Sequence, residues 1–170
     1  AVIANGGWRV EPRLFTSIRD TQDRIVDAPR SDRHLIVHRE SAFLVTDLMR
    51  SVIDEGTGRE IRARGFKAPA AGKTGSTDDS WFVGYTPDLL CAVWVGTDQS
   101  PALDLTGAEA ALPIWIQFMQ SAPATASNSY FDLPDNVVKV KMNPHTGLIA
   151  HEQSNEFVSA LFKIGTEPKE

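Results

Sequence analysis

The residues with the clearest chemical potential form one short run, Lys73-Thr74-Gly75-Ser76, which is followed by Thr77. Side chains two positions apart in a strand project from the same face, so the hydroxyls of Thr74 and Ser76 can both reach one carboxylate. Gly75 has no Cβ, which lets a bound peptide approach the strand closely. In a strand, this run could bind a carboxylate group of a ligand that approaches the strand closely.

Lys73 adds a positive charge to the same run. Its Cβ points to the opposite strand face from Thr74, but its long side chain could bring the ammonium group round to the same site. A charge-assisted hydrogen bond from such a group contributes about 1.5–3 kcal/mol net. Lys-Thr-Gly alone is also consistent with an ordinary edge-strand lysine beside a turn glycine, so the flanking sequence must decide between the two interpretations.

Acyl transfer through a covalent intermediate also needs a nucleophile beside an activating base. The sequence contains neither Ser-x-x-Lys nor Ser-x-Asn; the nearest approach is Ser159, where Lys163 comes one position too late. We therefore expect the substrate strand, but not the nucleophile, to be supplied by this chain.

Other chemistries fit the sequence less well. His34 and His38 have the i, i+4 spacing of a helical metal site, but no carboxylate stands at the metalloprotease spacing. The segment 151–155 begins His-Glu and has Asn where a zinc protease needs its second His, and the loop Gly56-Thr57-Gly58 lacks the third glycine of a dinucleotide site. We predict neither a metal nor a cofactor.

Three strands are expected around this run, over Ala70 to Thr77, Trp81 to Tyr85 and Leu89 to Gly96, with Thr86-Pro87-Asp88 as a tight antiparallel connection. Because the third strand is apolar on both faces, we expect it to be covered on both sides. The helical spacing over Ala108 to Gln120 supplies one cover, with Pro113 near its first turn.

A second amphipathic helix is predicted from a cap at Ser41 to a stop at Gly56. Its apolar residues form two neighbouring stripes, Leu44, Leu48 and Val52 on one and Val45, Met49 and Ile53 on the next. The basic segment Arg59 to Lys67 that follows it is typical of a solvated loop, or of a positive rim for an anionic ligand. The indole rings of the three tryptophans in the predicted sheet and its helix are expected in the core; they are Trp81, Trp94 and Trp115.

The ends of the chain carry weaker signals. Two short strands are predicted in the first forty residues, around a turn at Arg19 to Arg24. The stretch Ser121 to Ser129 is typical of a linker, and the alternation Val138, Val140, Met142 before Asn143-Pro144-His145-Thr146-Gly147 predicts a hairpin with Leu148-Ile149. The predicted fold is α+β, an antiparallel sheet with helices on both faces, in which residues 1–120 and 121–170 are two parts of the same domain.

Composition limits the partners. With 170 residues, of which 42% are hydrophobic, the chain is long enough for one globular core. Its net charge is −5 and it has no long basic run, so a nucleic-acid surface is not expected. It contains no apolar run of membrane-spanning length, and its single cysteine excludes an internal disulfide framework. Its N-terminal residue is not Met, which is typical of a cut end.

The flanks of the lysine run strongly resemble the transpeptidase domain of class A penicillin-binding proteins, the bifunctional peptidoglycan synthases. The resemblance spans the chain, from Ala4-Asn5-Gly6-Gly7 through the end of the first helix to Gly165-Thr166-Glu167-Pro168, and is strongest in three segments: Ala71 to Thr77, Ser80 to Pro87 and Val93 to Asp98. One departure is the short connection Asp78-Asp79-Ser80, which could alter the lip of the binding cleft.

The resemblance implies a β-lactamase-like transpeptidase fold and a serine-type D-Ala-D-Ala transpeptidase. An upstream serine would attack the donor stem peptide of peptidoglycan, D-alanine would leave, and an amine of a neighbouring strand would take the acyl group. Lys73 and Ser76 would be catalytic, the latter through its N–H in the oxyanion hole, and the substrate-binding residues would be Thr74, Gly75, Ser76 and Thr77. No cofactor is implied.

The same resemblance implies the partners and the location. The implied partners are the stem peptide, β-lactams and the upstream part of the same domain. The implied location is extracytoplasmic, in a protein that is anchored through an absent N-terminal segment and carries an upstream glycosyltransferase domain. Two alternatives remain open: a non-catalytic interaction module, which an upstream Ser-x-x-Lys would exclude, and a β-lactamase or carboxypeptidase, in which water resolves the acyl-enzyme.

Overall fold

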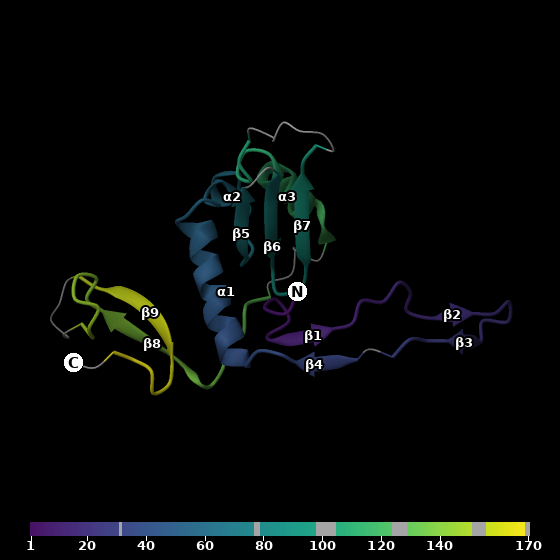
Figure 1. Ribbon diagram of the computed structural model, residues 1–170, viewed down its shortest axis with the longest axis horizontal. Helices are drawn as coiled ribbons and strands as arrows, with labels where there is room; N and C mark the ends of the chain where they lie inside the picture. Colours follow the sequence, from purple (N-terminus) through teal and green to yellow (C-terminus); the bar gives the residue numbers. More distant parts are fainter. Residues whose placement is uncertain (31, 77–78, 98–104, 124–128, 151–155, 169–170) are drawn as a thin grey trace.

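The computed structural model describes residues 1–30, 32–76, 79–97, 105–123, 129–150 and 156–168, with the side chain of Ser76 outside the description (Figure 1). Its elements are, in chain order, β1 (Trp8–Val10), β2 (Ile18–Arg19), β3 (Ile25–Asp27), β4 (Arg33–Leu35), α1 (Arg39–Asp54), α2 (Glu60–Ala63), β5 (Ala71–Ser76), β6 (Ser80–Tyr85), β7 (Leu90–Val95), α3 (Ala111–Ser121), β8 (Val137–Met142) and β9 (Val158–Lys163). None of the described helices has the length and apolar character needed to cross a membrane.

The central sheet has the strand order β5-β6-β7, with both pairs antiparallel. The three strands predicted from the sequence are thereby confirmed, with their ends shifted by at most one residue. The expected tight connection closes the β6–β7 hairpin, because the Thr86 N–H donates to the Leu89 carbonyl at 2.9 Å and the Thr86 hydroxyl accepts two further backbone bonds. Thr74, Phe82 and Val93 are register partners, so their side chains share one face of the sheet.

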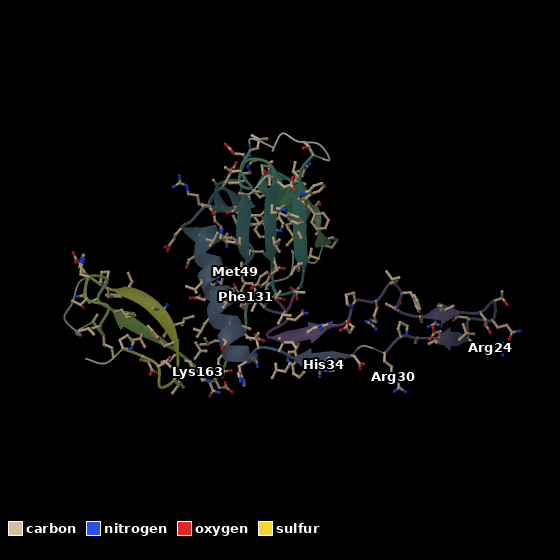
Figure 2. The ribbon with its side chains drawn as sticks, viewed as in Figure 1. Arg24, Arg30, His34, Met49, Phe131 and Lys163 are labelled. Atoms are coloured by element: carbon tan, nitrogen blue, oxygen red, sulfur yellow. The ribbon has the colours of Figure 1, made fainter. Side chains whose placement is uncertain are left out.

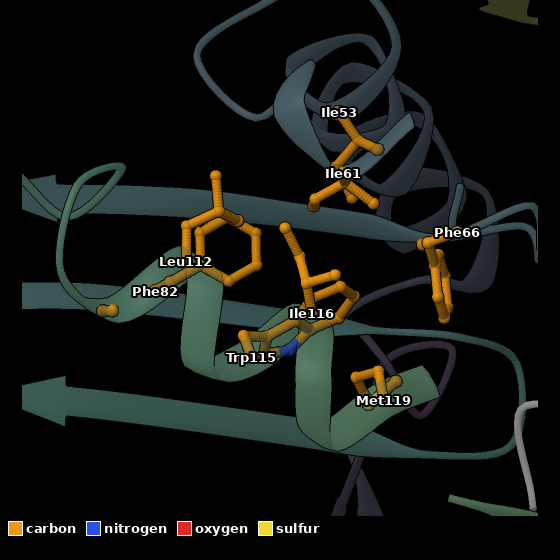
Figure 3. Packing of buried hydrophobic residues seen from close by; sticks show 10 residues of the cluster. Ile53, Ile61, Phe66, Phe82, Leu112, Trp115, Ile116 and Met119 are labelled. Atoms are coloured by element: carbon orange, nitrogen blue, oxygen red, sulfur yellow. The ribbon is translucent and has the colours of Figure 1, made fainter. Parts of the chain in front are cut away.

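Helix α3 covers that face and forms the main core with it (Figure 3). Trp115 is fully buried, meets the Phe82 and Phe66 rings edge-on, and donates its indole N–H to the Gly84 and Cys91 carbonyls at 3.3 and 3.2 Å. Pro113 is the third residue of the helix, where no backbone N–H is needed. The buried cluster consists of Ile53, Ile61, Phe66, Ala70, Phe82, Ala111, Leu112, Trp115, Ile116 and Met119.

Helix α1 runs beside β5 and packs against it (Figure 1). Its Thr46 hydroxyl lies 2.8 Å from the hydroxyl of Tyr85, which projects from the face opposite Phe82. Burial raises the pKa of Tyr85, so its phenol stays protonated at neutral pH. Helices therefore contact both faces of an antiparallel sheet, as the predicted α+β class requires.

The burial of α1 matches only part of the predicted pattern. Ile53, on the second predicted stripe, is buried together with Ala42 and Thr46, whereas Leu48, on the first stripe, is 70% exposed. Helix α1 packs closely against β5, which small buried side chains such as Ala42 and Thr46 permit. The predicted cap is also wrong: the helix begins after His38 without a side-chain cap, so Ser41 lies inside its first turn, while Gly56 does follow its end.

The second face of the sheet is only partly covered, which corrects two predictions. Along β7, exposed Leu90, Ala92 and Trp94 alternate with half-buried residues, so this strand is not covered on both sides in the described chain. Trp81 and Trp94 are 42% and 46% exposed and pack against each other, with ring centroids 6.3 Å apart. Of the three tryptophans predicted in the core, only Trp115 lies there.

The basic segment after α1 is more ordered than the predicted loop. It contains the single turn of α2, whose Ile61 is buried in the core. Arg62 donates to Asp54 at 2.8 Å and to the Phe66 and Ala68 carbonyls at 2.9 and 2.8 Å. The guanidinium thus joins the end of α1 to the approach to β5.

The N-terminal segment forms an extended ribbon that leaves the central sheet (Figures 1 and 2). It has four short strands where two were predicted, because β1 pairs with β4 and β2 with β3. The predicted turn between Arg19 and Arg24 is confirmed: the Asp20 carboxylate accepts the backbone N–H groups of Gln22 and Arg24 at 2.8 and 3.0 Å.

The C-terminal hairpin pairs β8 with β9, whereas the sequence predicted Leu148-Ile149 as the partner of β8. The turn after Met142 forms as expected, but the returning chain makes only one bridge, Met142 to Ile149. Figure 2 shows Lys163 of β9 near the N-terminal end of α1, where its ammonium lies 3.0 Å from the Glu40 carboxylate. The predicted linker overlaps the end of α3, and its residues 124–128 lie outside the described residues.

Candidate functional site

The lysine run lies on β5, which among the described strands is hydrogen-bonded only to β6 and so forms an edge of the sheet. Lys73 pairs with Val83 on the open face of the sheet, and Thr74 pairs with Phe82 on the face that α3 covers. The two side chains therefore leave the strand in opposite directions, as the alternation predicts. Only the outer edge of β5 is accessible to both.

The Lys73 side chain turns round this outer edge. Its ammonium donates to the Thr74 carbonyl at 2.6 Å and lies 3.4 Å from the Thr74 hydroxyl. The structure thus brings the cation and the hydroxyl together, although their Cβ atoms project from opposite faces. A cation here is well placed to attract an anionic ligand along the edge.

The backbone direction at Thr74 fixes that of Ser76. A carbonyl that accepts a bond from Lys73 points away from β6, and in a strand the backbone groups of alternate residues point to the same edge. The N–H of Ser76 accordingly points to the outer edge too, where a ligand can accept it. The Ser76 side chain and Thr77, the other predicted binding groups, lie outside the described residues.

Gly75 occupies the open face between the two outward-pointing residues. A Cβ added there would meet only the Cβ of Trp81, at 3.4 Å, which is ordinary van der Waals contact. Packing within the protein therefore does not require glycine at this position.

Thr57 is a member of the site that the sequence prediction missed. Its hydroxyl lies 3.0 Å from the hydroxyl of Thr74, and it belongs to the turn that joins α1 to α2. The contact joins residues 17 positions apart, so neither helical nor strand periodicity could have found it. The only signal was the Gly56-Thr57-Gly58 sequence itself, which failed as a dinucleotide loop.

Gly107 supports the strand pair from the α3 side. A Cβ at this position would collide with the carbonyl oxygens of Gly75 and Trp81, so the loop before α3 lies directly on the backbone of β5 and β6. Nearby, the Ser80 hydroxyl donates to the Leu105 carbonyl. These contacts hold the end of β5 in place without using its outer edge.

The histidines do not form a metal site among the residues that the structure describes. His34 lies in β4 and His38 precedes α1, so the pair is not on one helix, and His151 lies outside the described residues. No group of three or more His, Cys, Asp or Glu side chains with metal-binding geometry occurs in the described ranges.

One pocket lies away from Lys73, which is not among its lining residues. It has a volume of about 360 Å³ and lies between the N-terminal turn and the start of α1, with Trp8, Arg39, Phe43, Tyr85 and Phe131 in its walls. An exposed strand edge, by contrast, can bind an extended peptide through its backbone groups without a closed cavity.

The comparisons with known proteins agree with one another. A family model described as the penicillin binding protein transpeptidase domain matches residues 1–120. The chain is 34% identical to penicillin-binding protein 1A of Aquifex aeolicus over 172 residues, covering 98% of this chain and 23% of that protein. It is 29% identical to penicillin-binding protein 2D of Bacillus subtilis, covering 99% and 26%. It thus spans about a quarter of the length of these relatives.

Solved structures show the same fold. The crystal structure of penicillin-binding protein 1A from Haemophilus influenzae superposes with a TM-score of 0.85 at 22% identity, over 98% of this chain and 31% of that one. Penicillin-binding protein A from M. tuberculosis, as an imipenem acyl-enzyme complex, superposes with a TM-score of 0.53 at 24% identity, over 74% of this chain and 29% of that one.

Proposed function

The chain belongs to the penicillin-binding protein transpeptidase family, and from this premise we propose that it supplies the substrate-binding strand of a serine-type D-Ala-D-Ala transpeptidase that cross-links peptidoglycan. The observation that carries the proposal is the Lys73 ammonium beside the Thr74 hydroxyl on the open edge of β5. This arrangement offers a cation, a hydroxyl and outward backbone groups to an extended peptide with a terminal carboxylate.

The donor stem peptide would lie along the outer edge of β5. Thr74, with Ser76, would donate hydrogen bonds to the carboxylate of its terminal D-alanine, and the positive charge of Lys73 would favour that anion. Gly75 leaves room for the peptide backbone. Binding through these groups would set the scissile carbonyl beside the outward N–H of Ser76.

Acylation then requires a serine from the segment of the domain that precedes this chain. Its oxygen forms a bond to the scissile carbonyl carbon, the hydroxyl proton passes to a base, and the tetrahedral oxyanion accepts the Ser76 N–H. Collapse of this intermediate breaks the peptide bond, the base returns its proton to the leaving nitrogen, and D-alanine departs with a free amino group. The acceptor amine would then attack the acyl-serine and form the new amide bond, while one of its protons passes through the base to the departing serine oxygen.

The same proposal covers partners and location. β-Lactams present a carboxylate and a strained acyl group in the arrangement of the donor peptide, so they would acylate the same serine. The chain would act outside the cytoplasm, in a protein whose preceding part carries a glycosyltransferase domain and a membrane anchor. Residues 1–120 and 121–170 would be two parts of one transpeptidase domain.

The test is the rate of acylation by benzylpenicillin in the complete domain. Lys73→Ala should slow acylation by at least about tenfold, which corresponds to about 1.4 kcal/mol of lost transition-state stabilisation. Lys67→Ala, which removes a nearby exposed lysine of the preceding loop, is the matched control and should change the rate by less than about twofold. Equal rates for the Lys73→Ala and wild-type domains would overturn the proposed role of β5.

A further inference from the structure

We propose that Thr57 is a positioning residue that makes Thr74 a hydrogen-bond donor to the substrate carboxylate; this inference rests on the proposed function. Thr57 does not lie on the substrate strand. It acts through its hydroxyl, which lies 3.0 Å from that of Thr74. The proposal adds a residue of the α1–α2 turn to a site otherwise built on β5.

The argument is a count of protons and lone pairs. A threonine hydroxyl has one proton to donate and two lone pairs to accept with. The Lys73 ammonium can only donate, and it lies 3.4 Å from the Thr74 oxygen, so Thr74 accepts from it. An ionised carboxylate can only accept, so Thr74 must give its single proton to the ligand. Thr57 must then be the donor in its contact with Thr74.

With both lone pairs of Thr74 engaged, its proton has one direction left, outward to the ligand. Without Thr57, one lone pair of Thr74 is free for water, and its proton can rotate among several acceptors. The Thr57 bond therefore prepares the hydroxyl for an anion before the anion arrives. Such preorganisation improves carboxylate binding because less order has to be created when the ligand binds.

The turn that carries Thr57 is held on both sides. On the α1 side, the N–H groups of Gly56 and Gly58 donate to the Ser51 and Val52 carbonyls at 3.0 and 2.9 Å. On the α2 side, the Ile61 N–H donates to Gly58 at 2.9 Å. The position of the Thr57 backbone is thus fixed independently of Thr74.

Gly58 shows how tightly the turn packs. It is buried, and a Cβ there would lie 3.2 Å from the Val52 carbonyl oxygen and 3.3 Å from the Ile53 Cα. Ile53 and Ile61 on either side of the turn both belong to the buried core. Substituting the exposed Thr57 side chain should therefore leave this anchoring intact.

The experiment measures acylation of the complete domain by benzylpenicillin and by its methyl ester, which lacks the carboxylate charge. Thr57→Val removes the hydroxyl and keeps the side-chain shape; it should slow acylation by the free acid about three- to tenfold, the effect of one ordinary hydrogen bond. Acylation by the ester should change by less than about twofold. Thr57→Ser should restore most of the rate, and Thr21→Val in the distant β2–β3 turn should have no effect.

A double-mutant cycle with Thr74→Val is a second, independent test of whether Thr57 acts through Thr74. If Thr57 acts through Thr74, adding Thr57→Val to Thr74→Val should slow acylation by less than about twofold further. An undiminished effect of Thr57→Val in that background, or an equal loss with acid and ester, would overturn the proposal. A wild-type domain that benzylpenicillin does not acylate would instead overturn the proposed function on which it rests.

Discussion

Lys73, Thr74 and Thr57 form a continuous chain of polar groups at the outer edge of β5. All three side chains are at least partly exposed, so their mutual hydrogen bonds contribute little to the stability of the fold. We expect them to contribute instead to ligand binding, through the hydrogen-bond donors that they present along the outer edge of β5. Substitutions here should alter ligand binding and acylation before they alter folding.

Ser76→Ala distinguishes the role of the Ser76 hydroxyl from the role of its backbone N–H in the proposed carboxylate site. The substitution removes a hydroxyl and keeps the N–H, so we expect weaker donor recognition by roughly 0.5–1.5 kcal/mol with acylation retained. The measurement is the acylation rate of the complete domain as a function of benzylpenicillin concentration. A loss as complete as that caused by removing the nucleophilic serine would show that the role of this side chain is wrongly assigned.

At the level of elements, the position of β5 depends on how α1, α2 and the approach to the strand are joined. Arg62 makes this connection, because it binds Asp54 at the end of α1 and the carbonyls of Phe66 and Ala68. Arg64, which directly follows α2, pairs instead with half-exposed Glu60 at the start of that helix. The two arginines form a natural comparison within one turn.

Arg62→Met should destabilise the domain by about 1–3 kcal/mol, because two partly buried carbonyls lose their donor. Arg64→Met should cost less than about 1 kcal/mol, as expected for a surface pair. Urea unfolding of both variants of the complete domain measures the difference. Equal, small losses would mean that water replaces the Arg62 guanidinium without cost.

Some of the elements could be predicted from the sequence, and others could not. The strands β5 to β7 and helix α3 follow from local apolar patterns and a tight turn, and these were predicted to within a few residues. The stripes of α1 were right at Ile53 and wrong at Leu48, because the tertiary contacts of the helix, rather than its local pattern, bury small Ala42 and Thr46. Long-range contacts, such as β8 with β9 and Thr57 with Thr74, leave no local period in the sequence.

On the scale of the whole molecule, the β8–β9 hairpin contacts α1 through the Lys163–Glu40 ion pair, separated by 3.0 Å. The Glu40 backbone N–H, and then Lys163, hold the pKa of the Glu40 carboxyl below its usual range. A carboxyl whose pKa is lowered by folding contributes stability above its unfolded pKa, and this is lost as the pH falls through the folded value. The hairpin contact should therefore weaken in acid.

Amide hydrogen exchange of β8 and β9 in the complete domain, at about pH 6 and about pH 3, tests this. Protection, corrected for the intrinsic exchange rate, should fall at the lower pH in the wild type. Lys163→Met should lower protection at about pH 6 and make its pH dependence smaller. A pH response that is unchanged by Lys163→Met would show that other carboxyl groups govern the hairpin.

The central claim is that β5 works with a nucleophile from elsewhere in the domain, because the sequence contains no Ser-x-x-Lys. The second face of the sheet, where Trp81 and Trp94 are exposed, is also only partly covered in the described chain. Labelling by a fluorescent penicillin, with the acylated serine mapped by mass spectrometry, tests the central claim most directly. The 170-residue chain alone should not be labelled, and the same residues joined to the preceding segment should be labelled on a serine of that segment. Stoichiometric acylation of the 170-residue chain on one of its own serines would contradict the account.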